Sequence, residues 1–99
     1  MRKCRLYKEA IFIDKNHPIC RAKLGIIKLK QKDIQSALTH LEVAVKFDPN
    51  NWDYLYNLAL AYELSSDKVN AIDCYNKVLK LNPEHKESAK NLKILQNSR

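Results

Sequence analysis

The sequence predicts an all-α fold in which helix-turn-helix units stack into a solenoid of about five antiparallel helices. A period of 34 residues relates two stretches of the chain, so that Ala37 corresponds to Ala71 and Pro49 to Pro83. The apolar residues of both stretches follow helical spacing. A single glycine and three prolines leave little room for hairpins. Self-similarity at such a fixed period is typical of stacked repeats.

The N-terminal segment predicts one helix of an incomplete repeat. Its apolar residues lie on a helical stripe between residues 2 and 14, and one period relates Tyr7 to Leu41 and Ala10 to Ala44. Leu41 and Ala44 belong to the second helix of the next unit. We therefore interpret residues 1–16 as the trailing helix of a repeat whose leading helix is absent.

Residues 18–51 predict the first complete repeat. Pro18 suits the first turn of a helix over residues 19–30, because the N–H group it lacks has no partner there. After a short link, Asp33 is placed to cap a second helix over residues 34–47. Pro49 ends that helix, since the residue before a proline is pushed out of helical geometry. Short links between helices make them antiparallel neighbours.

Residues 52–85 repeat this pattern, and a final helix follows. The leading helix is expected over residues 52–64, with Asp67 capping a trailing helix that runs to Leu81 and is ended by Pro83. Residues 84–97 predict a C-terminal capping helix. Its apolar stripe is narrow and consists of Ala89, Leu92 and Leu95. A terminal repeat helix needs one packed face and one polar face.

Length, charge and cysteine count restrict the class of protein. Ninety-nine residues fit a single domain. The net charge of +7 is uneven, with +8 in residues 1–32, −4 in residues 33–85 and +3 in residues 86–99. The three cysteines have no C-x-x-C spacing, which favours a reducing compartment over a disulfide framework or a zinc site. No apolar run is long enough to span a membrane. We expect a cytoplasmic location, with the nucleus as the alternative.

These residues resemble the tetratricopeptide repeat (TPR) family over essentially the whole chain. The second unit matches the family motif at Leu55, Leu58, Ala59, Tyr62, Ala71, Tyr75 and Pro83. The first unit matches it at Leu24, Gly25, Ala37, Ala44 and Pro49, whereas Arg21 and Lys28 depart from it. The resemblance implies a right-handed superhelical stack that serves as a non-catalytic scaffold or adaptor for protein–protein interaction. The departures at Arg21 and Lys28 predict a less tightly packed leading helix in the first unit.

The resemblance also implies a concave groove, lined by the leading helices, that binds a peptide or a helix of a partner protein. The corresponding positions of the first unit are Ile19, Ala22, Lys23, Ile26, Leu29 and Lys30. Those of the second unit are Asp53, Tyr56, Asn57, Leu60, Glu63 and Leu64. The final helix supplies Lys90, Asn91 and Ile94. Much of this set is apolar, as in grooves that accept extended segments or amphipathic helices. The alternative is that neighbouring helices cover these residues and make them core.

Two modes of peptide binding known in the family can be compared with the residues of this groove. Asn57 and Asn91 lie one period apart, where an amide could pair with a peptide backbone. The carboxylate clamp of co-chaperone members matches at one of five positions, and Glu87 would repel a terminal carboxylate. We therefore expect a different mode of peptide binding from the clamp.

Catalytic, cofactor and metal sites are not expected. The three histidines have no H-x-x-x-H spacing, and Glu42 and Asp73 are interpreted as solvated charges. We accordingly predict that the protein is not an enzyme.

Two alternative functions remain from the sequence. The open N-terminal end, with Leu6, Ala10 and Ile13, could pair two copies or continue a longer repeat array. The basic N-terminal third could bind nucleic acid or an anionic surface weakly, although only Tyr7 and Phe12 there are aromatic and could stack on bases.

Overall fold

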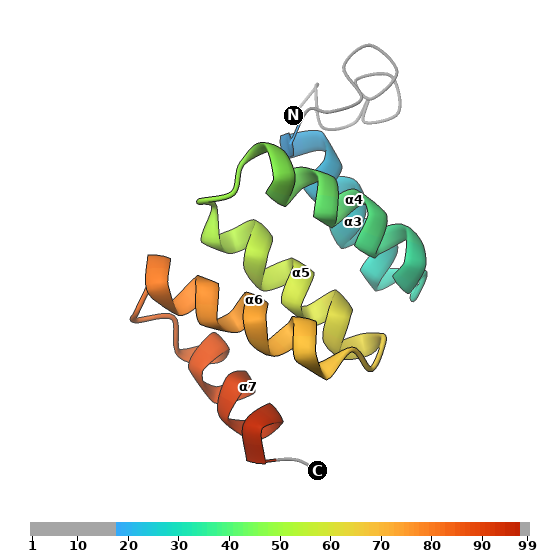
Figure 1. The fold of residues 1–99 in the computed structure, drawn as a ribbon. Helices are drawn as coiled ribbons and strands as arrows, with labels where there is room; N and C mark the ends of the chain where they lie inside the picture. The colour runs from blue at the N-terminus through green and yellow to red at the C-terminus, as the bar shows by residue number, and fades with distance from the viewer. Residues whose placement is uncertain (1–17, 98–99) are drawn as a thin grey trace.

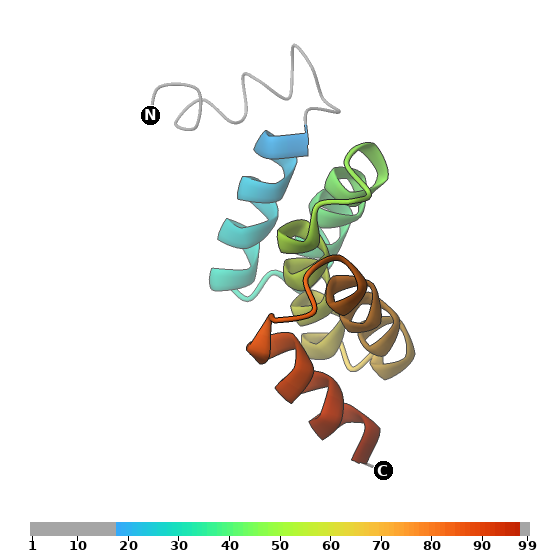
Figure 2. The same cartoon turned by 90° about the vertical axis from the view of Figure 1, so that its left-hand side faces the viewer.

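The computed structural model describes residues 18–97, which form five helices stacked along one axis (Figures 1 and 2). The helices are α3 (Pro18–Lys30), α4 (Ile34–Phe47), α5 (Trp52–Leu64), α6 (Lys68–Leu81) and α7 (Lys86–Asn97). Helix α3 packs on α4 and α5 packs on α6, as antiparallel pairs, while α4 contacts α5 and α6 contacts α7. The predicted all-α stack is confirmed. The expected helix over residues 2–14 lies outside the described residues.

The two tight turns within the pairs have the same hydrogen-bond pattern. The Asp33 N–H donates to the Lys28 carbonyl at 2.9 Å, and one period later the Asp67 N–H donates to the Tyr62 carbonyl at 2.9 Å. Lys32 and Ser66 adopt left-handed backbone geometry, with φ of 64° and 66°. This is the Schellman ending, usually made by glycine. The repeat is therefore conserved in backbone geometry even where the side chains differ.

Side-chain caps begin the helices that follow. Asp33 accepts from the Ser36 N–H at 3.4 Å and Asp67 from the Asn70 N–H at 3.3 Å, which confirms both predicted caps. Asn51 accepts from the Asp53 and Tyr54 N–H groups at the start of α5. Each cap satisfies amide groups that have no partner within their helix.

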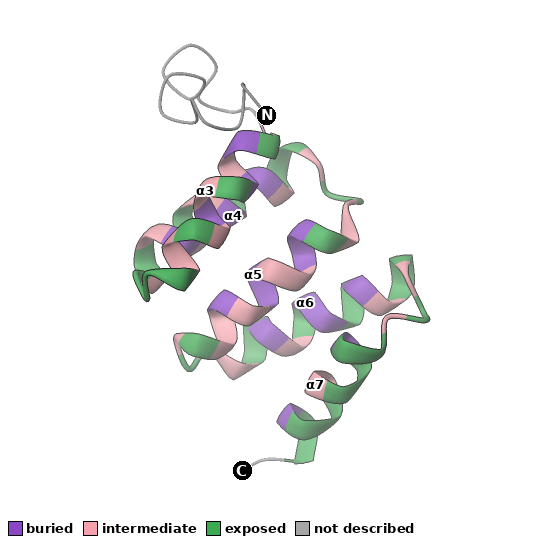
Figure 3. Ribbon diagram, turned by 180° about the vertical axis from the view of Figure 1, so that it is seen from behind, coloured by how far each residue is buried: buried purple, intermediate pink, exposed green. Residues whose placement is uncertain are grey.

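Small residues set the separation of the first helix pair. Gly25 of α3 faces Leu41 of α4, which is fully buried, and a Cβ atom added to Gly25 would lie 2.5 Å from Leu41 Cγ. Ala59, Ala37 and Ala71 are also completely buried. As Figure 3 shows, burial is concentrated on the faces where the helices meet. Helix α3 buries Cys20, Ala22 and Gly25, whereas the corresponding helix α5 buries five residues, so α3 is the more exposed of the two leading helices.

The packed face of α7 differs from the predicted stripe. Ala89 is exposed, whereas Ser88 and Leu95 are buried and Leu92 is half-buried. The helix starts at Lys86, two residues later than predicted, because residues 84–85 belong to the preceding turn. Ser88 can be buried because its hydroxyl group lies 2.7 Å from His85 Nδ1, which satisfies a polar group that the sequence alone leaves unpaired.

The described cysteines are structural. Cys20 and Cys74 are buried thiols, as expected for small apolar helix residues. Burial raises the pKa of Cys74 to about 11, so its thiol is protonated at neutral pH. Cys4 lies outside the described residues.

Replacing Gly25 by alanine should destabilise the protein. The new methyl group would overlap the buried Leu41 side chain, which costs about 1–3 kcal/mol, whereas the gain in helix propensity returns at most about 1 kcal/mol. Urea denaturation followed by circular dichroism measures the difference. Combining Gly25→Ala with Leu41→Ala should cost less than the sum of the single changes. An unchanged or raised stability of Gly25→Ala alone would refute the close contact.

Acidification should weaken the α3–α4 pair through His40. Arg21 Nη1 donates to His40 Nδ1 at 2.9 Å, and because arginine cannot accept, this bond needs neutral His40. Burial, and then the charges of Arg21 and Lys28, lower the pKa of His40 below its usual 6.5. The unfolded chain therefore takes up the proton first, and stability is lost as the pH falls through 6.5 towards the lowered value. Urea denaturation at pH 7.5 and pH 5 should show a smaller loss for His40→Gln than for the wild type; equal losses would contradict this role.

Candidate functional site

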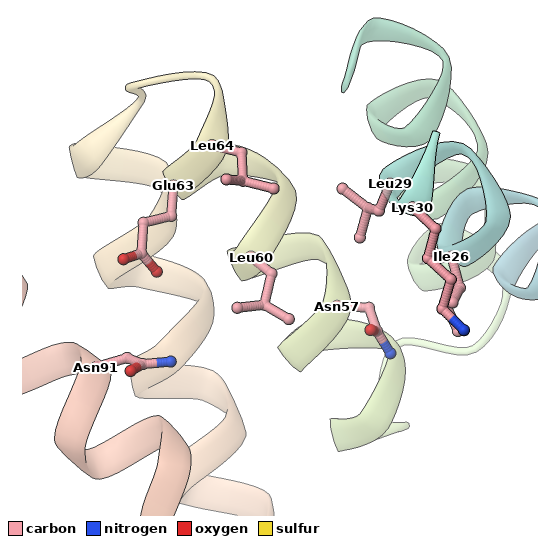
Figure 4. A pocket seen from close by; sticks show the side chains of 8 residues that line it. All are labelled: Ile26, Leu29, Lys30, Asn57, Leu60, Glu63, Leu64 and Asn91. Carbon is pink, nitrogen blue, oxygen red and sulfur yellow. The ribbon is translucent and has the colours of Figure 1, made fainter. Parts of the chain in front are cut away.

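A cavity lies where α3, α5 and α7 line one side of the stack (Figure 4). Its volume is about 610 Å³, within the range of about 300–1,000 Å³ usual for ligand pockets. Helix α3 contributes three side chains, α5 contributes four and α7 contributes one. The lining residues are Ile26, Leu29, Lys30, Asn57, Leu60, Glu63, Leu64 and Asn91. We call this cavity the groove.

All eight lining residues belong to the set predicted from the sequence, and seven predicted residues lie elsewhere. Ala22 is buried against Ala44 and Tyr54 and belongs to the core. Tyr56 is half-buried, with its ring against Tyr75 and His85. Five further residues are exposed on the same three helices without lining the cavity. They are Ile19, Lys23, Asp53, Lys90 and Ile94.

The apolar part of the groove comes from both walls. In Figure 4 the Leu29 side chain of α3 points towards α5, while Leu60 and Leu64 of α5 lie on the facing side. Leu64 is 62% exposed, so the stack leaves it largely uncovered. The alternative that neighbouring helices bury these residues therefore does not hold for Leu64 within the described part of the chain.

A hydrogen-bonded chain connects the groove to the core. The buried Tyr75 of α6 donates its hydroxyl proton to Glu63 Oε1 at 2.7 Å. Asn91 Nδ2 of α7 donates to the Tyr75 hydroxyl oxygen at 3.2 Å. Burial, and then the bond to Glu63, raises the pKa of Tyr75, so the phenol remains a donor at neutral pH. The three side chains fix α5, α6 and α7 relative to one another.

The two asparagines of the suggested peptide-reading ladder also have internal partners. Asn57 Nδ2 donates to the Asp53 carbonyl of its own helix at 2.9 Å. Asn91 uses one N–H on Tyr75. Each amide has a second N–H and a carbonyl oxygen, so both still carry groups that suit a peptide backbone. Their peptide-reading role stays a prediction.

Other polar residues are explained by local contacts. Glu42 is exposed and accepts from the Tyr62 hydroxyl at 2.7 Å, so it is more than a solvated charge. Asp73 pairs with Lys77 on the surface, where such pairs contribute little. Burial, and then the hydrogen bond to Glu42, raises the pKa of Tyr62 and keeps this phenol protonated as well.

The sequence analysis missed how α7 is attached. The His85 ring lies 4.7 Å from the Trp52 ring and 4.7 Å from the Tyr56 ring, both on α5. The Ser88 N–H donates to His85 Nδ1 at 3.2 Å, which caps the first turn of α7. Two aromatic residues four apart on α5, with a histidine just before the next helix, are the signal that could have indicated this contact.

A second cavity of about 300 Å³ lies between α4, α5 and α6. Its lining includes Val45, Leu55 and Leu81, with Lys77 and Lys80 as its charged members. None of these positions belongs to the predicted groove. Within residues 18–97, no helix combines the length and the apolar character that crossing a bilayer requires.

Comparisons with known proteins agree with the fold and with the repeat boundaries. The family model described as tetratricopeptide repeat matches residues 52–85, and a second model described as TPR repeat matches residues 27–65. Together they span residues 27–85. The chain belongs to the TPR family, whose domains are usually non-catalytic and typically serve as protein–protein interaction modules. Among curated proteins no relative was found.

Solved structures share the fold at low sequence identity. The first TPR of Spaghetti (RPAP3) bound to the HSP90 peptide SRMEEVD is 18% identical, with a TM-score of 0.87 over 92% of this chain and 72% of that one. A MamA RS-1 double mutant is 26% identical, with a TM-score of 0.85 over 95% and 53%. YrrB, a TPR protein with an unusual peptide-binding site, is 19% identical, with a TM-score of 0.79 over 91% and 46%. The chain thus spans about half the length of the last two.

Changing His85 to alanine should loosen α7 specifically. The change removes the cap and two ring contacts, worth about 1–2 kcal/mol together, so amide exchange in α7 should accelerate about 5- to 30-fold. Hydrogen-exchange mass spectrometry resolves the helices, and the exposed neighbour Glu84→Ala serves as the control. Equal acceleration in α4 and α7 would mean that His85 supports the whole fold instead of this attachment.

Proposed function

We propose that this chain is a non-catalytic interaction scaffold that binds a peptide or helical segment of a partner protein in the groove. The observation that carries the proposal is the 610 Å³ cavity lined by three helices, in which leucine and isoleucine side chains lie between polar ones. Binding sites for organic groups are mostly apolar, with a few placed polar groups that fix orientation.

The exposed apolar side chains favour a macromolecular partner. Leu64 is 62% exposed at the groove, and Ile94 is 54% exposed on the adjoining helix α7. Apolar side chains that gather on one face mark interaction surfaces, whereas scattered ones need no explanation. A groove between helices suits an extended segment or an amphipathic helix.

The relatives support this proposal at the level of the family. One structural neighbour is bound to the HSP90 peptide SRMEEVD, and another is described as having a peptide-binding site. Their identities of 18% and 19% establish a common fold, so the partner class rests on the residues of this groove.

The other functions raised by the sequence depend wholly or partly on residues outside the described part. Leu6, Ala10 and Ile13, on which self-association depends, precede Pro18. The basic N-terminal third extends over both parts: Arg2, Lys3, Arg5 and Lys8 precede Pro18, and the described residues contain Arg21, Lys23, Lys28, Lys30 and Lys32. Pairing of two copies, continuation of a longer array and weak binding of nucleic acid therefore stay predictions. The same is true of the cytoplasmic or nuclear location.

Replacing Leu60 by lysine should weaken peptide binding. A random 12-residue peptide library displayed on phage supplies the ligands, and fluorescence anisotropy of an enriched peptide measures affinity. Loss of an apolar contact of leucine size, worth about 1.5–3 kcal/mol, weakens binding about 10- to 100-fold. Val69→Lys is the matched control, because Val69 is 78% exposed and outside the groove. Equal binding by Leu60→Lys and Val69→Lys would place the peptide elsewhere.

A further inference from the structure

Glu63 differs from the usual surface carboxylate because buried groups fix its position. Tyr75, which holds Glu63 Oε1 at 2.7 Å, has no exposed surface, and its own oxygen is held by Asn91. Hydrogen bonds in such a chain strengthen one another in a low dielectric environment. The carboxylate is therefore oriented before any ligand arrives, which lowers the entropic cost of using it.

The negative charge of Glu63 has no cation beside it in residues 18–97. The ion pairs of this part of the chain join Lys77 to Asp73 and His85 to Glu87. Glu63 accepts from a neutral phenol, which leaves its charge in place and its second oxygen available. The carboxylate lines the groove together with Leu60 and Leu64 of the same helix.

The charges of the groove are separated between its walls. Figure 4 shows Glu63 and Asn91 on the side of α5 and α7, with Lys30 of α3 on the other side. Leucine side chains from both walls lie between these charges. A ligand that crosses the groove at Glu63 thus meets apolar surface next to a fixed anion.

We propose that the groove selects partner segments in which an arginine or lysine adjoins a large apolar side chain, with the cation held by Glu63. This inference deepens the proposed function and rests on it. A guanidinium group can bond a carboxylate through two N–H groups, and its aliphatic stem packs on apolar surface such as Leu60 and Leu64. Tyr75 and Asn91 act as positioning residues for Glu63.

The opposite charge preference is disfavoured by the same geometry. An acidic segment placed along α5 would meet Glu63, and Lys30, the only cation in the groove lining, lies on the opposite wall. Like charges at a desolvated contact reduce binding and so exclude wrong partners. A selected peptide whose arginine or lysine is replaced by glutamate is therefore a suitable negative probe.

The test uses the 12-residue library and full-length chain variants. Enriched peptides should carry arginine or lysine within a few residues of an aliphatic or aromatic residue. Glu63→Gln should weaken binding of the best peptide about tenfold or more, whereas Glu84→Gln, which removes the same charge outside the groove, should leave it unchanged. Replacing the peptide's arginine or lysine by glutamine should weaken its binding to the wild type by the same factor. The same replacement should change its binding to Glu63→Gln only slightly. Wild type should bind the best peptide at least tenfold more weakly when the peptide's cation is replaced by glutamate.

Tyr75→Phe separates orientation from charge. It keeps the carboxylate and removes its anchor, so affinity should fall by a smaller factor than with Glu63→Gln, and the salt dependence of binding should remain. Circular dichroism at the assay temperature confirms that each variant is folded.

Each result decides a different claim. If binding is lost in Leu60→Lys but not in Glu63→Gln, or if the enriched peptides lack cations, the groove binds peptides and the proposed cation contact is wrong. If no enriched peptide responds to Leu60→Lys, the proposed function itself is wrong, and the cation contact fails with it.

Discussion

The hydroxyl group of Tyr75 links the core to the groove, and the arrangement of three helices depends on it. Its ring is fully buried among α5, α6 and α7, where a phenol without a partner would be costly. The Glu63 carboxylate accepts a hydrogen bond from this hydroxyl group, and the Asn91 amide donates a hydrogen bond to its oxygen. The need to satisfy one buried polar group therefore determines which way two groove residues point. Core packing and surface chemistry have a common cause here.

Close packing of the helix pairs makes that arrangement possible. Gly25 admits Leu41 at a distance that no Cβ atom would tolerate, and Ala59 occupies the corresponding position one period later. Lys93 takes this position in α7 and is exposed. Ala89, one turn earlier on the same helix, is also exposed. Within residues 18–97, the close contact that small residues allow in the two helix pairs is therefore not repeated on this face of α7.

The 34-residue period was sufficient to predict the helix boundaries, the turns and the capping role of Asp33 and Asp67, because these depend on local sequence. The helix faces that contain the eight groove residues came from the resemblance to the TPR family. The periodicity failed at Ser88 and Ala89, where a hydrogen bond from outside the helix, at His85, decides which small residue is buried. The family resemblance placed Ala22 in the groove, because it does not reveal that Tyr54 of the next unit packs over this position. Contacts between units, unlike turns within them, combine side chains that no single repeat contains.

The Tyr75 network shows why the charge preference of the groove was not visible in the sequence. Tyr75 was identified as a residue of the family motif and Glu63 as a groove residue, and neither assignment indicates that the two side chains are hydrogen-bonded. A tyrosine at a fully buried position still requires a partner for its hydroxyl group, and Glu63 provides it from the neighbouring helix. Once that bond exists, Glu63 is a fixed anion in a leucine-lined cavity, although the chain as a whole carries +7. Physiological salt screens exposed charges beyond a distance of about 8 Å. The binding preference at such a site therefore follows from the nearby oriented carboxylate rather than from the net charge of the protein. The overall basic character of the protein and a groove that attracts cations are thus compatible.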